Sequence, residues 1–303
     1  MSNRQHTIPQ FYLRPFLSPG WVYRRGKFAP RATKNPAGVA VKRHYYGKGE
    51  SGRKTLDYLN SVAETYGAPV LKKLFEHPYA ITWRDYVKLS YLFANFFVRT
   101  PSIIEETRAM ELEMTMQANV MARKMTERLA QSLMNGSEVS DFLQAEPDNE
   151  SASMTLDQMN EHANRLQQKG GHRVAALDTF YSLVDIAECI QQMCFRLVEA
   201  PAHLFFLTSD KLLTLQRRAT GSRVGAGWKN NDALGLIPLC PSHFLLMFYA
   251  EPTGIGIQQA TPDQVVGLNL ETIRFADQEV YSPFQYQEAD DWMKAAGCWH
   301  PSG

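Results

Sequence analysis

Four side chains that are costly to bury are the main candidates for chemistry: His6, Glu64, Arg99 and Asp210. A histidine can move protons at neutral pH because its ordinary pKa is about 6.5. An arginine can hold an anion such as a phosphate, and a carboxylate can orient the histidine or accept its proton. With Arg14 as a second cation, this set would suit metal-independent cleavage of nucleic-acid phosphodiesters.

A structural role is an alternative for the same residues. A buried guanidinium must be neutralised, so Arg99 would form an ionic clasp with Glu64 and Asp210 where helices meet a sheet. His6 would then cap a helix or hydrogen-bond to backbone. Buried ion networks perturb pKa values without any catalysis, so the sequence leaves both roles open.

Known catalytic and metal-binding motifs are absent from the sequence. There is no His-Glu-x-x-His, no Gly-x-Ser-x-Gly, no phosphate-binding loop and no Cys-x-x-Cys pair. The eight histidines are scattered, which argues against a local metal site but not against one assembled from distant positions. We therefore expect no metal and no cofactor. The four cysteines are expected to be reduced thiols.

The basic residues are concentrated near the N-terminus. Residues 1–54 contain 12 Lys and Arg against Glu50 alone, a net charge of +11, whereas residues 55–250 and 251–303 carry −4 and −6. With interleaved aromatic residues, this segment would bind a nucleic acid, or it would lie against the acidic remainder of its own chain. The candidate anion-binding residues, besides Arg14, are Arg24, Arg25, Lys27, Arg31, Lys42 and Arg43.

Two prolines frame the segment that carries His6 and Arg14. Pro9 favours the first turn of a helix, and Pro15 is expected to end that helix and to move Arg14 out of the α region. Residues three and four apart share one helix face, so Pro9, Tyr12 and Leu13 are expected to pack inward.

Arg99 lies at the end of the most apolar helix that the sequence predicts, over residues 83–100. A helix that is apolar on nearly every side belongs in a core, so Arg99 is expected to be at least half buried. Thr82 and Asp85 predict its N-terminal cap. Further helices are predicted at 55–75, 102–135, 155–170, 172–199 and from Thr261, and the methionines of 102–135 are expected to be core residues.

The predicted fold class is α+β in a single domain over residues 1–303. A helical bundle (55–200) packs against a small antiparallel sheet, which is formed by the N-terminal hairpin and the C-terminal third (201–282). The hairpin is expected at 21–28, followed by an irregular crossing segment to residue 54. Further strands are expected at 202–208, 212–217, 244–250 and 280–281, and the tail 283–303 is expected to be peripheral.

The pattern His-x-x-Pro-x-x-Tyr-Leu-Arg-x-Phe, residues 6–16, resembles the start of a bacterial family of unknown function, DUF4238. Later segments follow the order of that family: Trp21-Val22-Tyr23, Tyr45-Tyr46, Glu64, Phe97-Val98-Arg99-Thr100-Pro101, Thr208-Ser209-Asp210, Pro238-Leu239-x-Pro241 and Leu268-Asn269. Leu212 departs from the pattern because the family usually has proline there. The resemblance covers residues 6–282 and implies no activity.

Three classes of function remain open from the sequence. They are a nuclease-like enzyme, a nucleic-acid-binding module without chemistry, and a protein-interaction module with an exposed apolar patch near the methionine helix. A role as a toxin or in phage defence rests on no residue. No apolar run approaches the roughly 18 residues of a membrane span, and no signal peptide is visible, so no membrane contact and a cytoplasmic location are expected.

Overall fold

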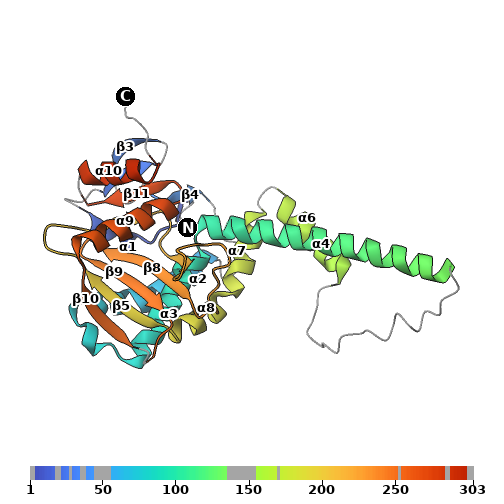
Figure 1. Cartoon of the computed structure of the whole chain (residues 1–303), viewed down its shortest axis with the longest axis horizontal. Helices are drawn as coiled ribbons and strands as arrows, with labels where there is room; N and C mark the ends of the chain where they lie inside the picture. The colour runs from blue at the N-terminus through green and yellow to red at the C-terminus, as the bar shows by residue number, and fades with distance from the viewer. Residues whose placement is uncertain are drawn as a thin grey trace. The chain divides into compact units, whose positions relative to one another are not determined.

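The computed structural model describes residues 4–17, 22–26, 29–34, 39–43, 56–134, 155–168, 171–251, 254–283 and 287–298. The chain divides into two compact units (Figure 1). Unit 1 comprises Met1–Ile103 and Thr179–Gly303, and unit 2 comprises Ile104–Asp178. The organisation of residues 1–303 as one domain stays a prediction. Within the described residues, no helix combines the length and the apolarity that crossing a membrane requires.

A five-stranded sheet forms the centre of unit 1, in the order β10-β5-β9-β8-β7. All neighbours are antiparallel except β10 and β5, which are parallel. The short turn between β8 and β9 explains their antiparallel pairing, whereas the parallel pair needs the long connection between β5 and β10. The strands are β5 (Cys194–Glu199), β7 (Thr214–Arg217), β8 (Ala233–Cys240), β9 (His243–Phe248) and β10 (Ile255–Gln259).

Three helices share the large hydrophobic core of unit 1 with this sheet: α2 (Leu56–Glu76), α3 (Trp83–Val98) and α8 (Leu183–Gln191). Phe93 of α3 packs edge-on against Phe195 of β5, with ring centroids 5.7 Å apart. The sequence leaves α2 open to disturbance at 67–69, yet α2 runs through this point. A Cβ at Gly67 would lie 2.7 Å from Leu92 Cβ, so the glycine permits close packing of α2 on α3.

A second, antiparallel sheet has the order β3-β2-β11-β6. It consists of β2 (Val22–Gly26), β3 (Ala29–Lys34), β6 (Thr208–Ser209) and β11 (Glu279–Ser282). Val280 of β11 shares a core with residues of α9 (Pro262–Phe275) and α10 (Gln287–Ala295). A two-stranded ladder of β1 (Arg4–His6) and β4 (Val41–Arg43) completes the sheets of the described residues.

The α+β class is confirmed, and the N-terminal hairpin of β2 and β3 pairs with the C-terminal strands β11 and β6 in one antiparallel sheet, as predicted. The predicted arrangement was wrong in three other respects. The C-terminal third also contributes β7–β10 to a separate, larger sheet, in which β10 and β5 are parallel. Residues 194–199 are a central strand rather than the end of a helix. The tail is not peripheral throughout, since Ala289, Asp290 and Met293 of α10 are buried.

Strands also replace segments that were predicted to be irregular. Residues 29–34 and 41–43 pair in ladders, and β8 lies between the predicted strands 212–217 and 244–250, where no strand was expected. Gly26 lies within β2, next to an irregularity in the register with β3. Such pairing depends on partners far away in the chain, which local propensity does not report.

Unit 2 consists of helical segments in the described residues: most of α4 (Pro101–Met134), α6 (Leu156–Gln167), and α7 (His172–Tyr181) as far as Asp178. Arg108 Nε of α4 donates to the Leu166 carbonyl of α6 at 2.8 Å, and Asn119 and Asn160 are hydrogen-bonded through their amides. The prediction that the α4 methionines are core residues was wrong. Met110, Met114, Met116, Met121 and Met125 are each more than half exposed.

The cap of α3 gives a prediction about pH. Asp85 and Thr82 form the predicted capping box, and Lys73 Nζ lies 2.6 Å from Asp85 Oδ2. The bond from Lys73, with those from Thr82, lowers the pKa of Asp85 to about 2. Because the folded pKa lies below the unfolded one, this stabilisation is complete above about pH 4 and disappears as the pH falls towards 2.

We therefore expect Asp85→Asn to lower the free energy of unfolding by about 1 kcal/mol at pH 7 and to have little effect near pH 2. Urea unfolding at both pH values, with the exposed Glu76→Gln as the control, measures this difference. An Asp85→Asn effect of equal size at both pH values would contradict it.

Candidate functional site

The N-terminal segment begins a short helix at the predicted place. α1 (Gln10–Leu13) follows Pro9 directly, and Tyr12 and Leu13 are buried as predicted. The α-helix ends before Pro15, as predicted, but the predicted effect of Pro15 on Arg14 was wrong. Arg14 keeps α-helical dihedral angles, and the chain continues as the 3-10 helix η1 (Arg14–Phe16). The tighter 3-10 turn tolerates a proline near its start because that residue needs no hydrogen-bond donor.

Tyr12 anchors α1 to the four-stranded and the five-stranded sheet of unit 1. Its hydroxyl lies 3.0 Å from Thr208 Oγ1 of β6 and donates to the Pro238 carbonyl of β8. Burial raises the pKa of Tyr12 far above its ordinary value, so the phenol is a hydrogen-bond donor and not a base. This anchor fixes the position of the segment that carries His6 and Arg14.

Arg99 lies at the C-terminal end of α3, and its side chain is only 3% exposed. The predicted ion pair with Glu64 of α2 is confirmed. Arg99 Nη2 also donates to the backbone carbonyl of His6 at 2.6 Å. The guanidinium therefore joins α2, α3 and β1, and its contact with His6 is to the backbone. The His6 imidazole is half-buried, with Nε2 2.9 Å from the side-chain nitrogen of Gln10.

Asp210 is fixed by the connection between α9 and β11. Its carboxylate accepts backbone N–H bonds from Asp277, Gln278 and Glu279, at 2.9, 2.8 and 3.1 Å. Burial, with the Asp277 carboxylate nearby, raises the pKa of Asp210 to about 7 although these three bonds favour the charged form. Asp210 therefore links the end of β6 to the start of β11. No contact among the described residues places it beside Arg99.

Lys211 is a second buried cation, and the sequence-based reasoning did not identify it. Its side chain is 1% exposed, and Nζ lies 3.0 Å from Ser102 Oγ and 3.8 Å from Asp277 Oδ1. Lys211 follows Asp210 directly and lies in a run of buried residues, Leu212 to Gln216. The sequence feature that could have identified Lys211 is its position next to an apolar stretch, because a buried ammonium group requires polar partners.

The arrangement around Arg99 fits the clasp better than it fits phosphate binding. Two of the guanidinium nitrogens already have bonds, to Glu64 and to the His6 carbonyl, and the side chain is enclosed. A phosphate would have to displace these bonds and enter a closed space. The catalytic roles of His6, Glu64, Arg99 and Asp210 stay a prediction.

Two of the predicted nucleic-acid contacts are occupied within the chain. Arg25 is 2% exposed, and its guanidinium donates to Asp290 Oδ1 at 2.8 Å and to Ser282 Oγ at 2.6 Å. Arg24 forms an ion pair with Glu279. Their assignment to an exposed basic face was therefore wrong, because both lie against the acidic C-terminal segment.

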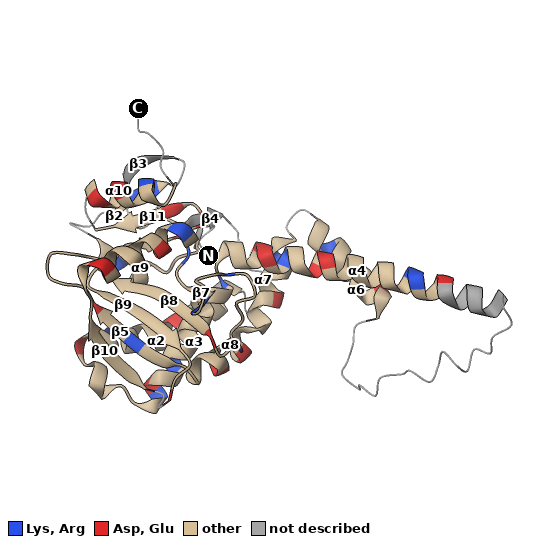
Figure 2. Cartoon of the chain, in the orientation of Figure 1, with Lys and Arg blue, Asp and Glu red and all other residues tan. Residues whose placement is uncertain are grey.

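The other members of the basic set are less informative. Arg14 is exposed. Lys27 and the side chains of Arg31, Lys42 and Arg43 lie outside the described residues. In Figure 2, Lys and Arg are interspersed with Asp and Glu along the described elements.

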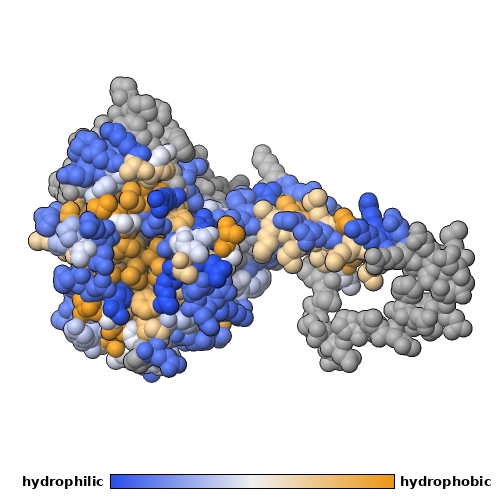
Figure 3. Space-filling model, viewed as in Figure 1, coloured by the Kyte–Doolittle hydropathy of each residue, from blue (hydrophilic) through white to orange (hydrophobic). Residues whose placement is uncertain are grey.

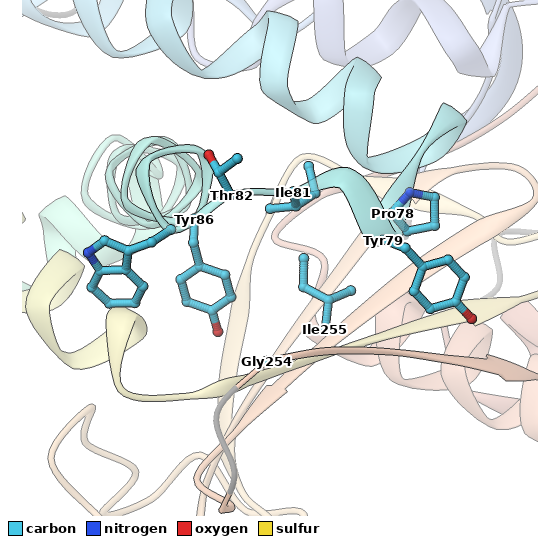
Figure 4. A pocket seen from close by; sticks show the side chains of 8 residues that line it. Pro78, Tyr79, Ile81, Thr82, Tyr86, Gly254 and Ile255 are labelled. Atoms are coloured by element: carbon cyan, nitrogen blue, oxygen red, sulfur yellow. The ribbon is translucent and has the colours of Figure 1, made fainter.

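A pocket of about 330 Å³ opens between the start of α3 and β10 (Figure 4). The described residues that line it are Pro78, Tyr79, Ile81, Thr82, Trp83, Tyr86, Gly254 and Ile255. None of these side chains is an acid or a basic cation, and the Tyr86 hydroxyl donates to the Met193 carbonyl. Such a lining would suit an apolar or aromatic group but supplies no proton-transfer chemistry.

Unit 2 contains a cluster of three ionisable side chains, one from each of the three helices that the structure describes there. Nε2 of His162 (α6) lies 3.1 Å from Oε2 of Glu111 (α4) and 3.6 Å from Oδ2 of Asp178 (α7). All three are half-buried, and this burial is the main cause that raises the pKa of both carboxyl groups. No sequence motif could have found this cluster, because its members are 51 and 16 residues apart.

These features define an α+β protein of two units, with buried cations that tie its N- and C-terminal segments to the core of unit 1. No curated protein and no solved structure matches the chain significantly. The chain belongs to DUF4238, a family described as a protein of unknown function, whose model matches residues 4–283.

Proposed function

We propose that this protein is a self-associating interaction module, in which one face of α4 packs against the same face of a second copy. The observation that supports this function best is the row of exposed methionines on α4. Apolar side chains gathered on one exposed helix face are typical of interaction sites. Methionine is common on such surfaces because its flexible side chain adapts to the partner.

The methionine face consists of Met110, Met114, Met121 and Met125, which are 55%, 54%, 67% and 71% exposed. At 100° per residue, the four side chains fall within an arc of ~60° on α4. The described helices of unit 2 leave this face uncovered, since α6 contacts the side of α4 that carries Arg108 and Asn119. Figure 3 shows apolar residues at the surface along α4.

The spacing of the methionine face favours a second copy as its occupant. The intervals of four, seven and four residues read the same in both directions along the helix. An antiparallel pair with a two-fold axis between Gln117 and Ala118 would place Met110 against the partner's Met125, and Met114 against the partner's Met121. A closed dimer has this symmetry, because the same patch serves both subunits.

Charges beside the methionine face agree with an antiparallel pair. Glu113 and Lys124 lie on the same flank and on opposite sides of the proposed axis, about 4.5 and 6.5 residues from it. In an antiparallel pair each Glu113 would lie near the partner's Lys124, whereas a parallel pair would place these two residues on opposite flanks of the interface. Opposite charges at the edges of a helix pair set its orientation.

We expect the wild-type protein to be a dimer, and the double substitution Met114→Lys with Met121→Lys to raise the dissociation constant more than about tenfold. Both positions are exposed, so the fold should be unaffected. Sedimentation equilibrium measures the mass, and circular dichroism checks that the variant is folded.

Met116→Lys is the matched control, because Met116 is 69% exposed but lies about 150° away from the methionine face. The control should remain a dimer. A monomeric wild type, or equal weakening by the double substitution and by Met116→Lys, would contradict the proposal.

A further inference from the structure

Glu111, His162 and Asp178 bring one imidazole nitrogen and two carboxylate oxygens to one point of unit 2. Each residue offers a ligand atom, and the three atoms lie within 4.8 Å of one another. This combination of nitrogen and oxygen ligands is characteristic of sites for zinc and other divalent transition metals. The cluster is separate from the Arg99 clasp and from the methionine face.

The distances agree with a shared ion. Bonds of about 2.0–2.1 Å in a tetrahedral site place neighbouring ligand atoms about 3.3–3.4 Å apart. The two measured spacings from His162 Nε2, 3.1 Å to Glu111 and 3.6 Å to Asp178, lie on either side of that value. Small rotations of the side chains would therefore suffice to bind an ion.

Asp178 supplies an independent observation. Its Oδ2 atom is enclosed, and within the described residues it has no hydrogen-bond partner. It faces Nε2 of His162 at 3.6 Å, which is too long for a hydrogen bond. A buried carboxylate oxygen without such a bond is costly, and a cation in the cluster would satisfy it.

The helices hold two of the three ligands in place before any ion binds. The bond from Arg108 to the Leu166 carbonyl and the paired amides of Asn119 and Asn160 fix α4 to α6 on either side of Glu111 and His162. Supporting bonds of this kind limit the reorganisation that metal binding requires.

We infer that unit 2 binds one divalent transition-metal ion, with Zn²⁺ as the best fit, through Glu111 Oε2, His162 Nε2 and Asp178 Oδ2. Three protein ligands leave a fourth position for water or for a ligand of the partner molecule. The side chains are 21–27% exposed, so this position is open to solvent. The simpler alternative is a protonated His162 that bridges two carboxylates without a metal.

Titration of the tag-free, full-length protein with Zn²⁺ and with Co²⁺ separates these alternatives. We expect one ion per chain by calorimetry, and visible absorption bands of Co²⁺ in a low-symmetry site without a sulfur-to-cobalt charge-transfer band. His162→Gln and Glu111→Gln should each weaken binding more than about tenfold. Circular dichroism verifies that each variant is folded.

Glu113→Gln is the matched control, because Glu113 is an exposed carboxylate of the same helix outside the cluster, and it should bind as the wild type does. No binding by the wild type, undiminished binding by folded His162→Gln, or a sulfur-to-cobalt band that places the ion on cysteine would overturn the inference. The double substitution Met114→Lys with Met121→Lys should still bind, so failure of self-association would not affect this result.

Discussion

Replacing Arg25 with methionine is expected to lower the free energy of unfolding by about 3–5 kcal/mol. Arg25 and Asp290 are 2% and 1% exposed, so the substitution leaves a carboxylate buried without its cation. It also removes the bond to Ser282, which ties β2 to β11. Urea unfolding followed by circular dichroism at pH 7 measures the loss.

Arg24→Met is the matched control for Arg25→Met. Arg24 precedes it in β2 and also pairs with a C-terminal acid, but Arg24 and Glu279 are each about a quarter exposed: 24% and 23%. Solvent screens this pair, so its loss should cost only about 1 kcal/mol. Equal effects of the two substitutions would contradict the view that Arg25 is a buried structural cation.

Arg99→Met is expected to cost about 2–4 kcal/mol. The change leaves Glu64 without its cation and the His6 carbonyl without its donor. The expected loss is smaller than for Arg25 because Glu64 is 25% exposed and can recover water. Glu64→Gln, which keeps an acceptor for the guanidinium, should cost only about 1 kcal/mol. Urea unfolding again measures both.

A His6→Ala variant separates a structural clasp from a nuclease. If Arg99 acts only as a clasp, wild type and His6→Ala should give identical products when incubated with mixed RNA and DNA, with and without a chelator. Cleavage by the wild type that a folded His6→Ala protein lacks, and that the chelator does not prevent, would instead assign His6 a catalytic role and contradict the structural account.

Local rules of the sequence predicted the ends of several helices correctly. Thr82 and Asp85 form the predicted capping box, and the helices predicted from Thr155 and Thr261 begin with capping boxes as well, because a cap depends only on residues three apart. The burial of Arg99 was also predictable. A helix that is apolar on nearly every side lies inside the core, so the residue at its end is largely shielded from solvent.

Non-local pairing explains most of what the sequence could not predict. Arg25 and Asp290 are 265 residues apart, and nothing near either residue indicates the other. The secondary structure of β5 was also not predictable from its own residues. Its apolar residues suit a buried strand as well as a helix until its neighbours are known. Methionines at helical spacing are equally ambiguous, because a core face and a docking face share one pattern.

Antiparallel self-association through α4 is tested most directly by disulfide trapping. The proposed two-fold axis lies beside Gln117, so two copies of that position would lie within the roughly 4.4–6.8 Å between Cα atoms that a disulfide allows. Met110 would face the partner's Met125 instead of its own copy. The wild type contains four free cysteines, so the amount of covalent dimer that it forms gives the background of the experiment.

Under mild oxidation, Gln117→Cys should therefore form a covalent dimer on a non-reducing gel. Met110→Cys should link only when it is mixed with Met125→Cys. Failure of Gln117→Cys to link above the wild-type background, or self-linkage of Met110→Cys alone, would contradict the antiparallel pairing of α4.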